Sequence, residues 1–276
     1  MQKKVLKRTG QEELFDPVKL CSSIVKAGGS IDLTDQVCTI VSESVDSGMT
    51  TEKIFRLTRK YLMKFNPALA AVYSLDRGLS ALGPSGFIFE QYVSAMFNEM
   101  GYKASTNHYM KGEAVEHEVD VVAEKGNAVF VVEAKYRNDF RTKTHINQVM
   151  YADARIEDIK RQAKKDGDNR NYYMWVVTNT RFTDNAINYV TKREVQLLGW
   201  DFPKFINLKK IAYEKKLWPI TVLPSITKSV LMKCAQNDII LVRHLEDFSE
   251  HDLQERFGAS SRLSKKLAEE VRELLT

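Results

Sequence analysis

The sequence predicts an α/β (α+β) protein with a small, mostly helical N-terminal region, a central mixed sheet flanked by helices, and a small helical C-terminal segment. Three observations support this prediction. Residues 1–83 contain helix patterns separated by glycine and proline, residues 84–213 mix helix-period and strand-period segments, and residues 214–276 return to short helices. We therefore expect three domains with boundaries near residues 83 and 213.

The N-terminal region begins with a basic strand and a helix whose ends are well marked. Lys7 and Arg8 lie on the strand. Asp16 stands at the N-cap position, Pro17 follows it, and Gly28-Gly29 come after the last turn. The apolar face expected for this helix consists of Val18, Cys21, Ile24 and Val25. Further helices are predicted over residues 34–46, 51–65 and 68–82.

The central region contains an apolar strand that ends in charged residues. Residues 129–132 form a continuous apolar run, typical of a strand buried on both faces of a sheet. Glu133 and Lys135 follow and share one face by alternation along the strand. A two-residue hairpin turn at Gly126-Asn127 brings Asp120 opposite Glu133. In this register the three charged side chains converge.

Two acids and a lysine in one place suit metal-assisted hydrolysis of a phosphodiester. Neighbouring carboxylates repel each other unless a proton or cation lies between them, and Mg²⁺ favours one or two carboxylates plus waters and phosphate oxygens. Asp120 and Glu133 would hold the ion, while Lys135 would orient water and offset charge on the phosphate. Alternatively, the acids are solvated strand ends and Lys135 forms a surface ion pair. If the register slips, Glu116 or Glu118 would replace Asp120, although Glu118 lies farther from Glu133.

Two more polar residues lie on the helices beside this motif. Glu90 occurs among the apolar positions of a helix within residues 87–100, so it points either to the rim or to the site. Gln148 lies on a polar helix over residues 144–164 and is either a site residue or part of a solvated face. The predicted order of the region is helix, three strands, helix, strand, helix, strand.

The central region resembles the Mrr-type branch of the restriction endonuclease-like nucleases over about residues 84–213. The similarity lies in FEQYVSAMFNEMGY, EVD, VVEAKY, Gln148 and VVTNTRFTDNAINYV. The resemblance implies a nuclease fold, a DNA substrate and Mg²⁺ as cofactor. By the same resemblance, the roles are metal ligands for Asp120 and Glu133, a water-orienting cation for Lys135, an accessory acid for Glu90, and a substrate or water contact for Gln148.

The opening of the chain resembles the ATP-cone, the nucleotide-sensing module of ribonucleotide reductases and their repressor. The matching residues are Val5, Lys7, Arg8, Gly10, Phe15, Asp16, Lys19 and Leu20, followed by MTTEKI and AAVYSLDRGL. The resemblance implies an ATP or dATP effector, with phosphate contacts from Lys7, Arg8 and Lys19, a base contact from Val5, and a pocket completed by Thr51 and Arg77. Clustered cations near helix N-termini suit a triphosphate. Alternatively, Lys7 and Arg8 form an exposed strand edge.

Neither resemblance explains the whole chain. A chain of 276 residues leaves no room for a reductase barrel beside the first module, and Cys21, Cys38 and Cys234 form no CxxC pair for a zinc ribbon. The C-terminal segment has short helices separated by Gly258. It loosely resembles helix-hairpin-helix modules and is otherwise a helical cap on a neighbouring domain.

Composition permits nucleic-acid binding without identifying it. The chain has 41 Lys and Arg against 36 Asp and Glu, a formal net charge of +5. No apolar stretch approaches the length of a membrane span, and residues 1–10 lack an apolar signal core. We therefore expect a cytoplasmic protein with reduced cysteines and no membrane contact.

Together these patterns predict a Mg²⁺-dependent endodeoxyribonuclease that ATP or dATP regulates through the N-terminal module. Cone modules in other hosts change oligomeric state with the bound nucleotide, so the resemblance implies a nucleotide-dependent homo-oligomer. The alternative is a catalytically silent DNA-binding or regulatory protein that responds to nucleotide. ATP hydrolysis is disfavoured because the chain has no Gly-x-x-x-x-Gly-Lys-Ser/Thr loop.

Overall fold

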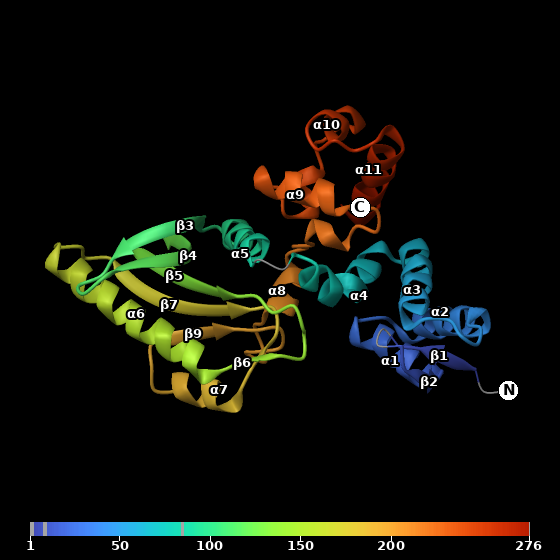
Figure 1. Ribbon diagram of the computed structural model, residues 1–276, viewed down its shortest axis with the longest axis horizontal. Coiled ribbons are helices and arrows are strands. Elements are labelled where there is room, and N and C mark those ends of the chain that lie inside the picture. Colours follow the sequence, from blue (N-terminus) through green and yellow to red (C-terminus); the bar gives the residue numbers. More distant parts are fainter. Residues whose placement is uncertain (1–2, 8–9, 84–85, 276) are drawn as a thin grey trace. The chain divides into compact units, whose positions relative to one another are not determined.

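The computed structural model describes residues 3–7, 10–83 and 86–275 (Figure 1). The chain divides into two compact units, Met1–Asp76 with Arg272–Thr276 and Arg77–Val271. The predicted fold class is confirmed: a helical N-terminal region, a central five-stranded mixed sheet with helices, and a helical C-terminal segment follow one another along the chain. No helix within the described ranges is both long and apolar enough to cross a membrane.

The first unit is a β-hairpin followed by helices. Strands β1 (Lys4–Leu6) and β2 (Glu12–Leu14) pair antiparallel. The helices that follow are α1 (Pro17–Lys26), α2 (Ile31–Ser44), α3 (Thr51–Phe65) and α4 (Pro67–Ser80), the last of which spans the boundary between the units. Helix α2 begins three residues before its predicted start, because Ser30 caps it by accepting a hydrogen bond from the Leu33 amide.

Helix α1 has the predicted ends but buries a different face. The Asp16 side chain accepts a hydrogen bond from the Val18 amide, and Pro17 occupies the first turn. The expected apolar face is wrong at Val18 and Val25, which are 71% and 55% exposed. The prediction is correct at Ile24, which is buried, and it missed Leu20, which is also buried because the stripe that faces the rest of the unit is rotated by part of a turn.

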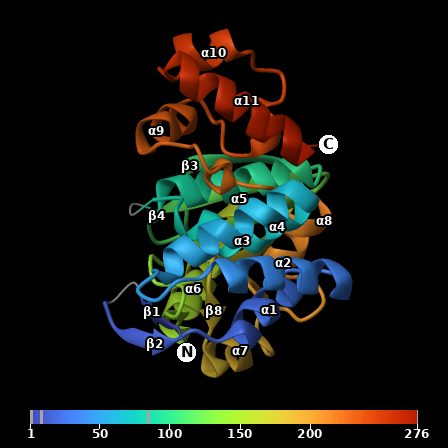
Figure 2. The same cartoon turned by 90° about the vertical axis from the view of Figure 1, so that its right-hand side faces the viewer.

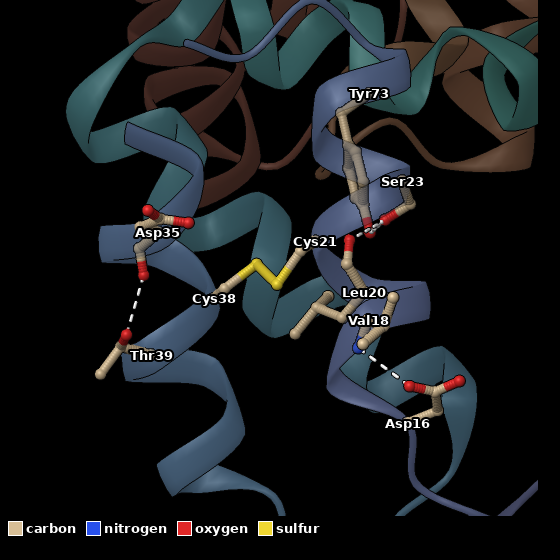
Figure 3. Close-up of a disulfide and its surroundings, with 9 residues drawn as sticks. All are labelled: Asp16, Val18, Leu20, Cys21, Ser23, Asp35, Cys38, Thr39 and Tyr73. Atoms are coloured by element: carbon tan, nitrogen blue, oxygen red, sulfur yellow. Dashed lines mark hydrogen bonds between the residues drawn. A yellow bond between two sulfur atoms is a disulfide. The ribbon is translucent and has the colours of Figure 1, made fainter. Parts of the chain in front are cut away.

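The expectation that the cysteines are reduced is wrong for two of the three. Cys21 of α1 and Cys38 of α2 form a disulfide (Figure 3). Helices α1 and α2 pack together and bring the two Cα atoms to 5.6 Å, within the range that a disulfide spans. Cys234 is a free, buried cysteine. Sequence spacing alone could not reveal this pair, because Cys21 and Cys38 meet only after the helices pack.

The second unit is built on a five-stranded sheet in the order β3-β4-β5-β7-β9 (Figure 1). Its strands are β3 (Lys103–Lys111), β4 (Glu116–Lys125), β5 (Ala128–Lys135), β7 (Asn171–Thr178) and β9 (Val195–Leu198). The first three strands are antiparallel, whereas β7 and β9 run parallel to β5. The predicted hairpin is confirmed, since Lys125 pairs with Ala128 across a turn in which Gly126 has φ +59°.

Helices cover both faces of this sheet. Helix α5 (Phe87–Glu99) packs against β3 and β4, and α6 (Ile146–Lys165) packs against β7. The short strands β6 (Lys143–Thr144) and β8 (Arg181–Phe182) pair parallel to each other, and α7 (Asp184–Val190) lies beside β9. Apolar residues of α6, such as Val149 and Ile156, form one core with Val129 and Val131 of β5. This packing fixes α6 against the strand that carries Glu133 and Lys135.

The C-terminal segment is helical and contacts α5. Helix α8 (Leu208–Glu214) leads into it. The segment contains η1 (Ile220–Val222), α9 (Lys228–Gln236), η2 (Val242–Leu245), α10 (Glu250–Glu255) and α11 (Ser261–Leu275), and Figure 2 shows α9, α10 and α11 gathered together. The buried Tyr92 hydroxyl donates a hydrogen bond to the Leu217 carbonyl, and the Gln91 amide donates one to the Ala235 carbonyl. These bonds favour the helical-cap interpretation of this segment, while its helix-hairpin-helix character stays a prediction.

Candidate functional site: two acids and a lysine where β4 and β5 separate

The β4–β5 hairpin holds its acids at the point where the two strands part. Backbone pairing ends at Val121 and Val132, and Asp120 and Glu133 are the next residues on the two strands. There the Asp120 carboxylate accepts a hydrogen bond from the Ala134 amide at 2.7 Å, in the place of a backbone carbonyl. Beyond this point β4 continues along β3, and β5 continues along β7.

Glu133 is buried and contacts a cation through each of its oxygens. It is 7% exposed, and its Oε1 atom contacts the Lys135 ammonium. Its Oε2 atom contacts the guanidinium of Arg155, which projects from α6. A buried carboxylate is stable only when it is paired, and Lys135 and Arg155 provide one partner for each oxygen of Glu133. Lys135 is itself held in β5, because the Thr178 hydroxyl donates to the Lys135 carbonyl at 2.7 Å.

The other acids carry negative charge that is only partly balanced. Burial, followed by the nearby charge of Glu133, raises the pKa of Asp120 to about 6. Burial, followed by the charge of Asp120, raises the pKa of Glu90 to about 7. Glu90 therefore belongs electrostatically to this cluster and not to a distant rim. Perturbed pairs of this kind occur most often where a protein binds a cation or transfers a proton.

The structure places Gln148 and Arg155 on the same stripe of α6, two turns apart. Within the described residues, no hydrogen bond or ion pair joins the Gln148 side chain to Asp120, Glu133 or Glu90. Arg155 is the α6 residue that reaches Glu133, and sequence reasoning missed it. The available signal was weak, since Arg155 is one of several charges on a polar helix and only its spacing of seven residues from Gln148 set it apart.

The residues present fit a hard divalent cation. The donors at the point of separation are carboxylate oxygens, which Mg²⁺ prefers, and the raised pKa values of Asp120 and Glu90 show negative charge that a cation would offset. No group of three or more His, Cys, Asp or Glu residues in the described part of the chain is arranged to hold a metal by itself. A magnesium ion would therefore take Asp120 and Glu133 and complete its shell with water and phosphate oxygens.

In the first unit, two of the predicted phosphate-binding lysines share one acid. Lys7 Nζ lies 3.0 Å and Lys19 Nζ 3.7 Å from the carboxylate of Glu13 on β2. The hydrogen bond from Lys7 holds the pKa of Glu13 below its usual range. Glu13 was not among the predicted residues, because an acid on a short exposed strand such as β2 has no signature of its own. The two lysines are thus near each other, as phosphate binding requires.

The other predicted nucleotide contacts are dispersed among different elements. Val5 of β1 is 3% exposed, and Thr51 is the first residue of α3. Arg77 belongs to the second unit, and Arg8 lies outside the described residues. The roles of Val5, Thr51, Arg77 and Arg8 in nucleotide binding stay predictions.

Three family descriptions match successive parts of the chain. The family described as ATP cone domain matches residues 3–80, the Mrr catalytic family described as restriction endonuclease matches residues 83–208, and the family described as AF1548-like, C-terminal matches residues 218–275. These spans follow the order of the helical region, the five-stranded sheet and the C-terminal helices.

Individual proteins are also similar to this chain. An uncharacterized protein of Archaeoglobus fulgidus is 27% identical over 183 residues, which cover 66% of this chain and 99% of that protein. The crystal structure of AF1548, a protein of unknown function, has a TM-score of 0.60 and 27% identity and covers 69% of this chain and 98% of that one. The MspJI restriction endonuclease in complex with a 27-mer oligonucleotide has a TM-score of 0.35 and 16% identity, covering 53% of this chain and 31% of that one. The chain thus consists of an ATP-cone domain, an Mrr-type restriction endonuclease domain and an AF1548-like C-terminal domain.

Proposed function

We propose that the chain is a Mg²⁺-dependent endodeoxyribonuclease that hydrolyses DNA phosphodiester bonds and responds to ATP or dATP bound at its ATP-cone domain. The observation that carries this proposal is the convergence of Asp120, Glu133 and Lys135 where β4 and β5 separate. They lie within the span that matches a restriction endonuclease family. An intact set of acids and lysine in such a domain favours retained chemistry over a silent scaffold.

Each residue of the site has a distinct part in the proposed hydrolysis. When bound, magnesium would polarise the phosphodiester and acidify the attacking water. Asp120 and Glu133 would hold the ion, and the Lys135 ammonium beside Glu133 would offset the charge that grows on the phosphate. Glu90, with a pKa of about 7, is matched to accept a proton from water near neutral pH. The water oxygen bonds to phosphorus as the bond to the leaving oxygen breaks.

The ATP-cone domain would supply the regulation. In the structure, Lys7 and Lys19 both pair with Glu13. A triphosphate carries more charge than one carboxylate, so it would draw the lysines from Glu13 and reorganise the β1–β2 hairpin. A nucleotide-dependent homo-oligomer is the form of response that the cone resemblance favours.

One observation favours a second candidate, a nucleotide-responsive DNA-binding protein without turnover. Both oxygens of Glu133 are already occupied by Lys135 and Arg155, an arrangement that is self-sufficient as a buried ion-pair cluster. If the cluster is only structural, the domain keeps its fold and its DNA surface but does not hydrolyse.

The decisive experiment is cleavage of supercoiled and single-stranded DNA in Mg²⁺, with and without ATP or dATP. Lys135→Ala is compared with Lys125→Ala, which removes the same side chain from the other end of the β4–β5 hairpin. We expect cleavage by the wild type and by Lys125→Ala, and none by Lys135→Ala or in EDTA. A folded wild-type protein that cleaves neither DNA in any nucleotide state would establish the silent alternative.

A further inference from the structure

Arg155 holds a position between Glu133 and an open groove. Its guanidinium contacts Glu133 Oε2, and its side chain is 24% exposed. It also lines a groove of about 780 Å³ that runs between α6 and the turn joining β3 to β4. The guanidinium of Arg155 therefore has two alternative positions, one at Glu133 and one in the groove.

Either oxygen of Glu133 that a metal ion could use already contacts the positive charge of Lys135 or Arg155, which would repel the ion. One partner must move. Lys135 is two residues from Glu133 on the same strand, and β7 holds its backbone. Arg155 comes from another element and borders open space, so its head group can leave with α6 unchanged.

The guanidinium that leaves Glu133 needs an anionic partner. With Glu90, Asp120 and Glu133 ionised, Lys135 and Arg155 leave the cluster with one negative charge, and a bound divalent cation would change this to one positive charge. The acids that line the groove, Asp153, Glu157 and Asp158, already pair with Arg193, Lys160 and His117. A phosphate of a nucleic-acid strand would supply a new anion, and the planar fork of arginine binds phosphate through two parallel hydrogen bonds. A strand whose scissile phosphate lies at the acids would present its neighbouring phosphates to the groove.

We propose that Arg155 is an exchangeable partner of Glu133, which it releases when a divalent cation binds and then contacts a phosphate of the nucleic-acid strand in the adjacent groove. The proposal rests on the proposed function of the site, and it makes Arg155 a positioning residue that couples cation binding to substrate binding. Either ligand alone would bind more weakly than in the presence of the other.

The first test is the affinity for Mn²⁺ without DNA, measured by electron paramagnetic resonance. Arg155→Gln removes the competitor for Glu133 and should bind Mn²⁺ at least threefold more tightly than the wild type. Arg161→Gln is the matched control, because Arg161 lines the same groove from α6 but pairs with Glu113 at 3.7 Å and not with the site acids. The control should keep the wild-type affinity. Equal affinities for Arg155→Gln and the wild type would overturn the proposal.

The second test is DNA binding in EDTA, where turnover plays no part. Glu133→Gln removes the carboxylate that holds Arg155, so the freed guanidinium should raise DNA affinity. The double variants Glu133→Gln/Arg155→Gln and Glu133→Gln/Arg161→Gln have the same net charge. We expect Glu133→Gln/Arg155→Gln to bind DNA about tenfold more weakly than Glu133→Gln/Arg161→Gln. The decrease of its DNA affinity with salt concentration should also be less steep, by the amount that corresponds to about one phosphate contact.

Equal DNA affinities for the two double variants, or no DNA binding by Glu133→Gln, would overturn the exchange. If Arg155→Gln alone fails to fold because Glu133 loses a partner, the double variants still decide, since neither of them carries the Glu133 carboxylate that needs this partner. Both tests are independent of hydrolysis. If the wild type does not cleave DNA but both tests give the expected differences, the proposed function is refuted and the exchange of Arg155 still holds. If the wild type cleaves DNA but neither the Mn²⁺ affinity nor the DNA affinity differs between the variants, the exchange is refuted and the proposed function still holds.

Discussion

The backbone amide of Ala134 donates a hydrogen bond to the Asp120 carboxylate across the point where β4 and β5 part. Asp120 therefore has two roles. Its side chain ends the ladder of backbone hydrogen bonds between β4 and β5, and it carries charge next to the neighbouring acids. The site is therefore built into the sheet and does not depend on a mobile loop. Substitutions of Asp120 should distinguish its structural role as a hydrogen-bond acceptor from the effect of its charge.

Asp120→Ala and Asp120→Asn are expected to differ in stability. The alanine variant leaves the buried amide of Ala134 without an acceptor, which costs about 2 kcal/mol of unfolding free energy. The asparagine variant keeps an oxygen acceptor and removes the repulsion with Glu133, so at pH 8 in EDTA it should be at least as stable as the wild type. Calorimetry of the three proteins measures this difference, and equal destabilisation by both variants would contradict it.

The metal-free protein should lose stability as the pH rises. The folded-state pKa values of Glu90, about 7, and Asp120, about 6, lie above the ordinary values of 4.5 and 3.8. The folded state therefore binds more protons than the unfolded state between pH 4 and 7, and its stability falls through this window. In EDTA, the unfolding temperature of Glu90→Gln should fall less between pH 5 and pH 8 than that of the wild type. Parallel curves for the two proteins would show that Glu90 does not titrate in this window.

The Cys21–Cys38 disulfide should stabilise the first unit. It closes a loop with a sequence separation of 17, for which chain entropy corresponds to about 3 kcal/mol. The variant Cys21→Ser/Cys38→Ser should thus unfold at a lower temperature than the oxidised wild type. Dithiothreitol should shift the wild type to the same temperature and leave the double variant unchanged. A wild type that does not respond to the reductant would contradict this role.

Glu13→Gln should strengthen nucleotide binding. The change removes the carboxylate that Lys7 and Lys19 share, so a triphosphate no longer competes with it. The lysines are substantially exposed, and we expect a gain of only about threefold in ATP affinity by calorimetry. Glu12→Gln is the matched control, because Glu12 lies next to Glu13 on β2 but pairs with Lys4. The same gain in ATP affinity in both variants would mean that it comes from the loss of one negative charge on β2 and not from the release of Lys7 and Lys19.

Much of the site followed from local signals in the sequence. The turn at Gly126-Asn127 and the alternation along β5 were sufficient to predict the register that brings Asp120 next to Glu133. The cap residue Asp16 and the following Pro17 likewise predicted the start of α1, and α3 has the predicted span of residues 51–65. These features depend on residues close together in the chain, and for this reason they could be predicted without a tertiary structure.

The fold class, the order of elements and the set of acids and lysine on the hairpin were all predictable from the amino-acid sequence. Three features became visible only in the folded chain: Arg155 contacts Glu133, Cys21 joins Cys38, and α1 buries Leu20 while Val18 and Val25 are exposed. Each of these depends on how one helix packs against another element. Such packing is decided by the summed burial of many side chains, so no local pattern could encode it.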